Sequence, residues 1–146
     1  MKIAAFVVVA VLSLTVFSPA RADTPAACPL ALAQKSLCAS ITWTTQPSDD
    51  DFSAFTLRFW NPAQGTSAGP YLSPAEELHV NLFMPSMGHG SSPVKIAPAK
   101  DLHGQVIPGT YQVSEVYFTM HGEWEIQLEL RKDGKPVDRA KLGYKF

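Results

Sequence analysis

Apolar and polar residues alternate with a period of two along much of this chain, and this pattern constrains the fold more than any other feature of the sequence. It is clearest in residues 123–131, where Trp124, Ile126, Leu128 and Leu130 alternate with polar residues that include three glutamates. Successive side chains of a β-strand point to opposite faces of the sheet. The pattern therefore predicts a strand with these four side chains directed into a core and the glutamates directed to water.

Turn residues separate the alternating segments and set the number of strands. Gly, Pro, Ser and Asp are frequent between them, and residues 132–135 (KDGK) have the composition of a hairpin turn. Only residues 29–37 (PLALAQKSL) look helical. We expect an all-β fold, an antiparallel immunoglobulin-like β-sandwich of about seven strands with a short helical N-terminal segment. The predicted strands cover residues 39–45, 55–60, 78–84, 94–97, 111–120, 123–131 and 137–146.

The start of the chain has the pattern of a secretory signal. Lys2 precedes an apolar run of 15 residues, and Ala20, Arg21 and Ala22 give the small-x-small pattern that a signal peptidase accepts. The run is too short to cross a bilayer readily, since a membrane helix needs roughly 20 apolar residues. We expect residues 1–22 to be a signal peptide and residues 23–146 to form a single β-sandwich domain, periplasmic and without a membrane span after cleavage.

Cys28 and Cys38 are the only cysteines of the chain. An exported chain normally reaches an oxidising compartment, so a disulfide between them is favoured. A thiolate pair for metal or redox chemistry is an alternative, although the spacing is unlike that of Cys-x-x-Cys. A lipid anchor on Cys28 is another, although the preceding residues TPAA lack the leucine that such signals usually carry.

Charge and motif content exclude two classes of function. Removing residues 1–22 takes away Lys2 and Arg21, so the formal charge changes from −1 to −3, and no run of Lys or Arg is present to neutralise a phosphate backbone. No G-x-S-x-G or H-E-x-x-H motif and no paired Cys and His nucleophile pattern occurs. We expect neither a nucleic-acid partner nor an enzyme.

Two short segments carry the side chains that bind soft metals. The first is FMPSMGHGSS, residues 83–92, and the second contains a Met-His pair. Thioethers favour monovalent copper and imidazoles serve either copper state or zinc, whereas calcium and magnesium require oxygen. The sequence therefore predicts a copper site, with Cu(I) favoured and Cu(II) left open. Its candidate ligands are Met84, Met87, His89, Met120 and His121.

Strand order predicts that these two segments meet. If each strand crosses the sandwich once, the strand that ends at Met84 and the strand that ends at Met120 finish at the same pole. The same count places the aspartate-rich turn of residues 46–51 at this pole, and His79 and His103 at the opposite one.

Each candidate ligand also has an ordinary structural interpretation. Met84 and Met120 continue the predicted inward faces of their strands, so both could simply fill the core. His121 could be an exposed turn residue. Met87 and His89 lie outside any predicted strand and have no apolar pattern to satisfy, which favours a ligand role for both. Trp124 is expected to cap the core, with lining of the site as the alternative, and the aspartates of the 46–51 turn are expected to be solvated.

Residues 84–87 (MPSM), 109–111 (GTY) and 118–124 (FTMHGEW) form three motifs in this order. Together they resemble the YtkA-like and FixH-like group of exported or membrane-attached sandwich domains, over residues 78–131. His121 is a departure, because proline is common there in the group. The resemblance implies an immunoglobulin-like fold and an association with copper handling or oxidase assembly.

These features predict a periplasmic copper-binding protein that carries or buffers the metal at a surface Met/His site. The expected partners are a copper ion and a copper-handling or oxidase-assembly protein of the periplasm or membrane. The alternative is a metal-free interaction module, in which the loop of residues 84–89 and exposed edge strands dock a partner protein.

Overall fold

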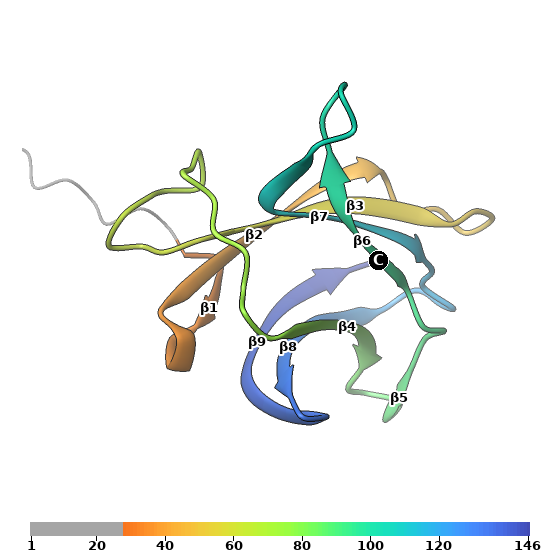
Figure 1. Ribbon diagram of the computed structural model, residues 1–146. Helices are drawn as coiled ribbons and strands as arrows, with labels where there is room; N and C mark the ends of the chain where they lie inside the picture. The colour runs from red at the N-terminus through yellow and green to blue at the C-terminus, as the bar shows by residue number, and fades with distance from the viewer. Residues whose placement is uncertain (1–27) are drawn as a thin grey trace, which may run out of the picture.

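Two antiparallel sheets form a β-sandwich in residues 28–146, the part of the chain that the computed structural model describes (Figure 1). The predicted signal peptide, residues 1–22, lies outside the described residues. An all-β fold is confirmed. Among the described residues, no helix has the length and apolar character needed to cross a membrane.

The first sheet has the strand order β1-β2-β3-β7-β6. Every neighbouring pair in it is antiparallel. Its strands are β1 (Leu30–Leu32), β2 (Leu37–Thr45), β3 (Ser53–Trp60), β6 (Lys95–Lys100) and β7 (Val106–Val116).

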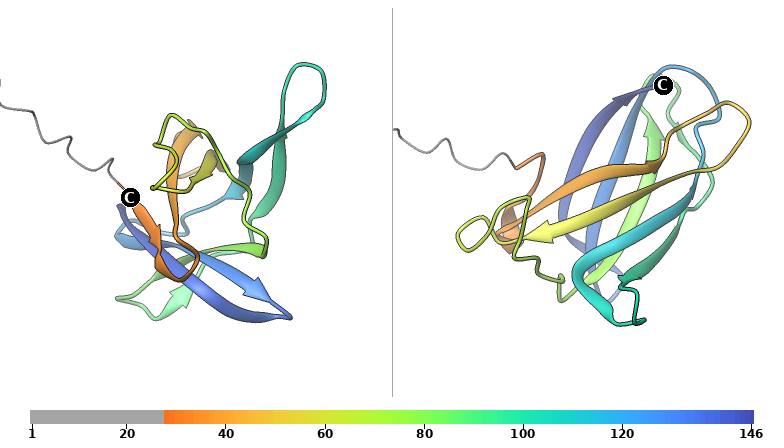
Figure 2. Two further views of the ribbon diagram at one scale, coloured as in Figure 1. Left: turned by 60° about the vertical axis from the view of Figure 1, so that its left-hand side comes forward. Right: turned by 90° about the horizontal axis from the view of Figure 1, so that it is seen from above.

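The second sheet has the order β5-β4-β8-β9, and β2 and β3 of the first sheet lie over it when the molecule is seen from above (Figure 2, right). The β8–β9 hairpin turns at Asp133 and Gly134, as the KDGK segment predicts. Its strands are β4 (Glu77–Met84), β5 (His89–Gly90), β8 (Glu123–Lys132) and β9 (Lys135–Lys145).

The core lies between the sheets and is built from the inward faces that the alternation predicts. All four apolar side chains of residues 123–131 are at most 1% exposed. Burial of this kind contributes roughly 25 cal/mol for each Å² of apolar surface removed from water. The other predicted inward side chains that are buried include Phe55, Leu57, Phe59, Val80, Leu82, Met84, Val116 and Phe118.

The predicted N-terminal helix over residues 29–37 is wrong. This segment forms β1, a single 3-10 turn η1 (Ala33–Lys35) and the start of β2. Leu30 and Leu32 are buried while Ala31 between them is exposed, which is the period-two burial of a strand. The segment is too short for helical propensity to outweigh the pairing of β1 with β2.

The strand predicted to run to Met120 ends earlier. β7 stops at Val116, after Glu115 adopts φ 56° and the pairing with β3 shifts register. Such a bulge switches the face on which the following residues lie. It accounts for a buried Val113 being followed by a buried Val116. Phe118 is still buried, as the alternation predicts, but the chain has left the strand before it reaches Met120.

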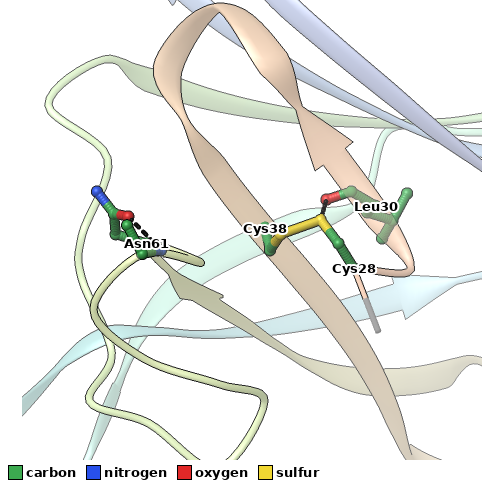
Figure 3. Close-up of a disulfide and its surroundings, with 5 residues drawn as sticks. Cys28, Leu30, Cys38 and Asn61 are labelled. Carbon is green, nitrogen blue, oxygen red and sulfur yellow. Dashed lines mark hydrogen bonds between the residues drawn. A yellow bond between two sulfur atoms is a disulfide. The ribbon is translucent and has the colours of Figure 1, made fainter. Parts of the chain in front are cut away.

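A disulfide joins Cys28 to Cys38, as predicted, with the two Cα atoms 5.3 Å apart (Figure 3). The bond ties the residues before β1 to β2 and uses the thiol that a lipid anchor on Cys28 would need. The Cys28 Sγ lies 3.6 Å from the carbonyl oxygen of Leu30. The disulfide therefore holds the β1–β2 hairpin closed where sequence alone suggested a helix.

Replacing both Cys28 and Cys38 with alanine is expected to lower the free energy of unfolding by about 3 kcal/mol, because the unfolded chain regains the entropy of a loop of this size. Urea denaturation of the purified protein and of the double variant measures the difference. Treating the unchanged protein with a thiol reductant should reproduce the shift. Equal denaturation midpoints and slopes would contradict the prediction.

Candidate metal site

Three loops meet at one end of the sandwich, as the strand order predicts. They are residues 85–88 after β4, residues 117–122 between β7 and β8, and residues 46–52 between β2 and β3 (Figure 2, right). The Ser91 hydroxyl donates a hydrogen bond to the carbonyl of Tyr117, and the Tyr117 hydroxyl donates one to the carbonyl of Asp49 at 3.1 Å. We call this end the Met/His pole.

A tight turn brings Met84 and His89 opposite each other at this pole. The amides of Met87 and Gly88 both donate to the carbonyl of Met84, at 3.2 and 2.9 Å, and Gly88 has the positive φ of 68° that favours glycine. Met84 and His89 are then direct partners in the β4–β5 ladder. Opposed residues of an antiparallel pair share a face, with Cβ atoms about 5 Å apart. The strand pairing thus sets a thioether beside an imidazole.

His89 lies in the short strand β5, which the hydrophobic alternation of the sequence does not predict. Its Nδ1 is 3.1 Å from the carbonyl oxygen of Gly90. A carbonyl only accepts hydrogen bonds, so this contact requires the proton on Nδ1. In the neutral ring it leaves the Nε2 lone pair free to bind a metal, which is the arrangement that carbonyl partners impose on metal-binding histidines.

Met84 is buried, with 2% of its surface exposed, beneath the 117–122 turn. A Cβ added to Gly122 would lie 2.8 Å from the Met84 Cε and 4.0 Å from its Sδ. Gly122 also has φ 149° and exchanges backbone hydrogen bonds of 2.8 and 3.0 Å with Phe146. Glycine at this position therefore lets the turn close directly over the thioether.

Trp124 connects the two ligand-bearing segments. Its indole Nε1 donates a hydrogen bond of 3.0 Å to the carbonyl of Met120, and its ring meets the His89 ring edge to face at 6.3 Å between centroids. The side chain is 1% exposed and contacts Phe118 in the core. Capping of the core is confirmed, and the same residue also contacts the candidate site, the alternative that sequence left open.

Met120 and Met87 are exposed, whereas Met84 is not. Met120 is 39% exposed and Met87 is 60% exposed. The prediction that Met120 packs on an inward face is therefore wrong, because β7 ends before it. The expectation that Met87 has no core role agrees with its exposure.

His121 shares the 117–122 turn with Met120 but makes different contacts. Its Nε2 is 3.1 Å from the Asp49 Oδ1, and its ring stacks on Phe146 at 4.7 Å between centroids. Both side chains of this contact are more than half exposed. Asp49, which was expected only to be solvated, therefore also contacts the candidate ligand His121.

Met84 and His89 are therefore ladder partners with Met87 on the turn between them, and Trp124 contacts both the His89 ring and the backbone carbonyl of Met120. In residues 28–146 no three side chains of the His, Cys, Asp and Glu types lie close enough to share a metal ion. The five candidate ligands at the Met/His pole are not a cluster of this type, because three of them are methionines, which bind a metal through thioether sulfur.

The other two histidines lie elsewhere. His79 is in β4 and contacts Glu77 at 3.0 Å, and His103 is in the exposed hairpin between β6 and β7.

Comparison with known proteins found no similar one: no protein-family model, no curated protein and no solved structure matches the chain.

Proposed function

We propose that this protein binds copper as Cu(I) at the Met/His pole and acts as a carrier or buffer of the metal. The observation that carries the proposal is the pairing of Met84 with His89 in the β4–β5 ladder, with the His89 Nδ1 3.1 Å from the carbonyl oxygen of Gly90. Thioether sulfur favours monovalent copper, and imidazole nitrogen binds copper in either state. Nε2 of His89 and Sδ of Met84 are the proposed inner ligands.

Met87 and Met120 complete the proposed ligand set from the solvent side. Their exposure supports a carrier, because ligands in contact with solvent can be exchanged for those of a receiving protein one at a time. His121 is assigned a different role. Its contacts with Asp49 and Phe146 support a part in holding the 117–122 turn over Met84.

The proposal also includes a family, a cellular location and a partner for the protein. We assign the sandwich to the immunoglobulin-like type and the chain to the YtkA-like and FixH-like group, on the motifs in residues 84–87, 109–111 and 118–124. The signal peptide predicted for residues 1–22 and the disulfide support a periplasmic location. A copper-handling or oxidase-assembly protein is the proposed recipient of the metal.

The test is a competition titration of the purified protein with cuprous ion against a coloured Cu(I) chelator, under anaerobic conditions. We expect one tightly bound equivalent. The variant His103→Gln is the matched control, because it removes an imidazole from an exposed hairpin and should leave the titration unchanged. Less than one bound equivalent at micromolar protein would contradict the proposal.

A metal-free docking module is the second candidate. Exposed apolar side chains at the same pole favour it, since Phe52 is 59% and Met87 is 60% exposed. Phe52 packs edge to face on Tyr117 at 5.9 Å between centroids, so the patch is continuous with the 117–122 turn. The two candidates differ in the titration, because a docking module takes up no copper.

A further inference from the structure

We infer that Met87 and Met120 are sites of oxidation by peroxides, and that their oxidation switches off metal binding at the pole while Met84 is spared. The inference rests on the proposed function and adds a mode of regulation to it. It starts from the different exposure of the three methionines in residues 28–146, all of which lie at the Met/His pole.

Exposure separates the three thioethers sharply. Met87 is 60% and Met120 is 39% exposed, whereas Met84 is 2% exposed and lies beneath Gly122. Methionine oxidation follows access of the oxidant to sulfur. Neither exposed side chain is needed to fill the core, so oxidation of either one leaves the packing beneath it intact.

Oxidation by peroxide and metal binding both use the lone-pair electrons of the methionine sulfur. A sulfur lone pair attacks one oxygen of hydrogen peroxide, the O–O bond breaks, a sulfur–oxygen bond forms, and water leaves after proton transfer. Sulfur loses two electrons and the peroxide gains them. The sulfoxide is a polar oxygen donor in place of a soft sulfur donor, and soft donors are what monovalent copper selects.

Metal binding and oxidation therefore oppose each other at each exposed sulfur. A bound monovalent ion takes one of the two sulfur lone pairs and makes the other less nucleophilic, which slows oxidation, and a sulfoxide at Met87 and Met120 leaves only Met84 and His89 as soft or borderline donors for the metal. Methionine sulfoxide reductases return the sulfoxide to the thioether, so the change is reversible.

The experiment exposes the purified metal-free protein to hydrogen peroxide, maps the added oxygen by peptide mass spectrometry, removes the peroxide, and repeats the Cu(I) titration. We expect Met87 and Met120 each to gain one oxygen at a rate on the order of tenfold faster than Met84. The oxidised protein should retain its fold and bind Cu(I) at least about tenfold more weakly. Prior loading with Ag(I), a soft monovalent ion that peroxide does not oxidise, should slow the oxidation of both residues.

The double variant Met87→Leu with Met120→Leu is the matched control, and under the same exposure it should gain oxygen at the pole only at the slow rate of Met84. Oxidation of Met84 as fast as Met87 would overturn the inference, and so would unchanged Cu(I) binding after both sulfoxides have formed. Failure of the proposed copper binding itself would give a different result from these two outcomes. If the unoxidised protein binds no Cu(I), the proposed function fails and the switch fails with it, whatever the order of oxidation.

Discussion

Replacing Trp124 with alanine is expected to lower the free energy of unfolding by about 4 kcal/mol and to remove Cu(I) binding with it. The side chain is 1% exposed and packs edge to face on Phe118 at 5.4 Å between centroids, so truncation leaves a large cavity in the core. It also removes the hydrogen bond to the carbonyl of Met120 and the ring contact with His89. Urea denaturation and the Cu(I) titration measure the two effects.

The variant Trp124→Phe separates packing from positioning. It keeps an aromatic ring in the core but cannot donate a hydrogen bond to Met120, a loss of about 1 kcal/mol for a neutral pair. Because that bond fixes the turn that carries Met120, we expect weaker Cu(I) binding in a protein that remains folded. Unchanged Cu(I) affinity in this variant would contradict the positioning role.

Trp60→Phe is the matched control for both tryptophan variants. Trp60 is 0% exposed and pairs with Cys38 across β2 and β3, so it lies with the disulfide and not with the candidate ligands. Within residues 28–146 its indole Nε1 has no hydrogen-bond partner, so phenylalanine removes an unpaired polar group there. The Cu(I) titration of this variant should match that of the unchanged protein.

The inward faces of the long strands could be predicted from sequence because burial on one side imposes a period of two. In residues 123–131 the alternation alone identifies four core side chains, and the structure buries all four. Strand order then placed the 84–89 and 117–122 segments at one pole, since an antiparallel sandwich returns alternate strand ends to the same side. Local pattern and chain direction were sufficient for this.

Features that depend on partners distant in sequence could not be predicted in this way. The strand β5 has two residues, too few for any periodicity, and exists because Met84 pairs with His89. The β7 bulge at Glu115 and the pairing of His121 with Asp49 also have no local signal. The motif G-x-W was visible at Gly122 and Trp124, but only the structure shows that the glycine admits the Met84 thioether.

Replacing His89 with glutamine is expected to weaken Cu(I) binding by about 100-fold or more, while the protein remains folded. Loss of a group that merely orients a ligand typically costs 10- to 100-fold in metal affinity, and His89 is proposed to be a ligand itself. The side chain is half-buried at the rim of the core, so its removal leaves the packing beneath it intact. The same chelator competition measures the change, with a urea denaturation curve as the check on folding.

The variant His121→Gln tests whether His121 binds the metal, as the sequence predicts, or only positions the 117–122 turn, as we propose. If His121 binds the metal, its loss should cost as much as the loss of His89. If it holds the 117–122 turn through Asp49 and Phe146, the effect should be less than about tenfold, since an exposed polar contact between two side chains contributes only about 0 to 1 kcal/mol. Asp49→Asn should then produce the same small change, because it breaks the same contact from the other side. A large loss on His121→Gln with no change on Asp49→Asn would assign the imidazole to the metal and overturn the positioning role.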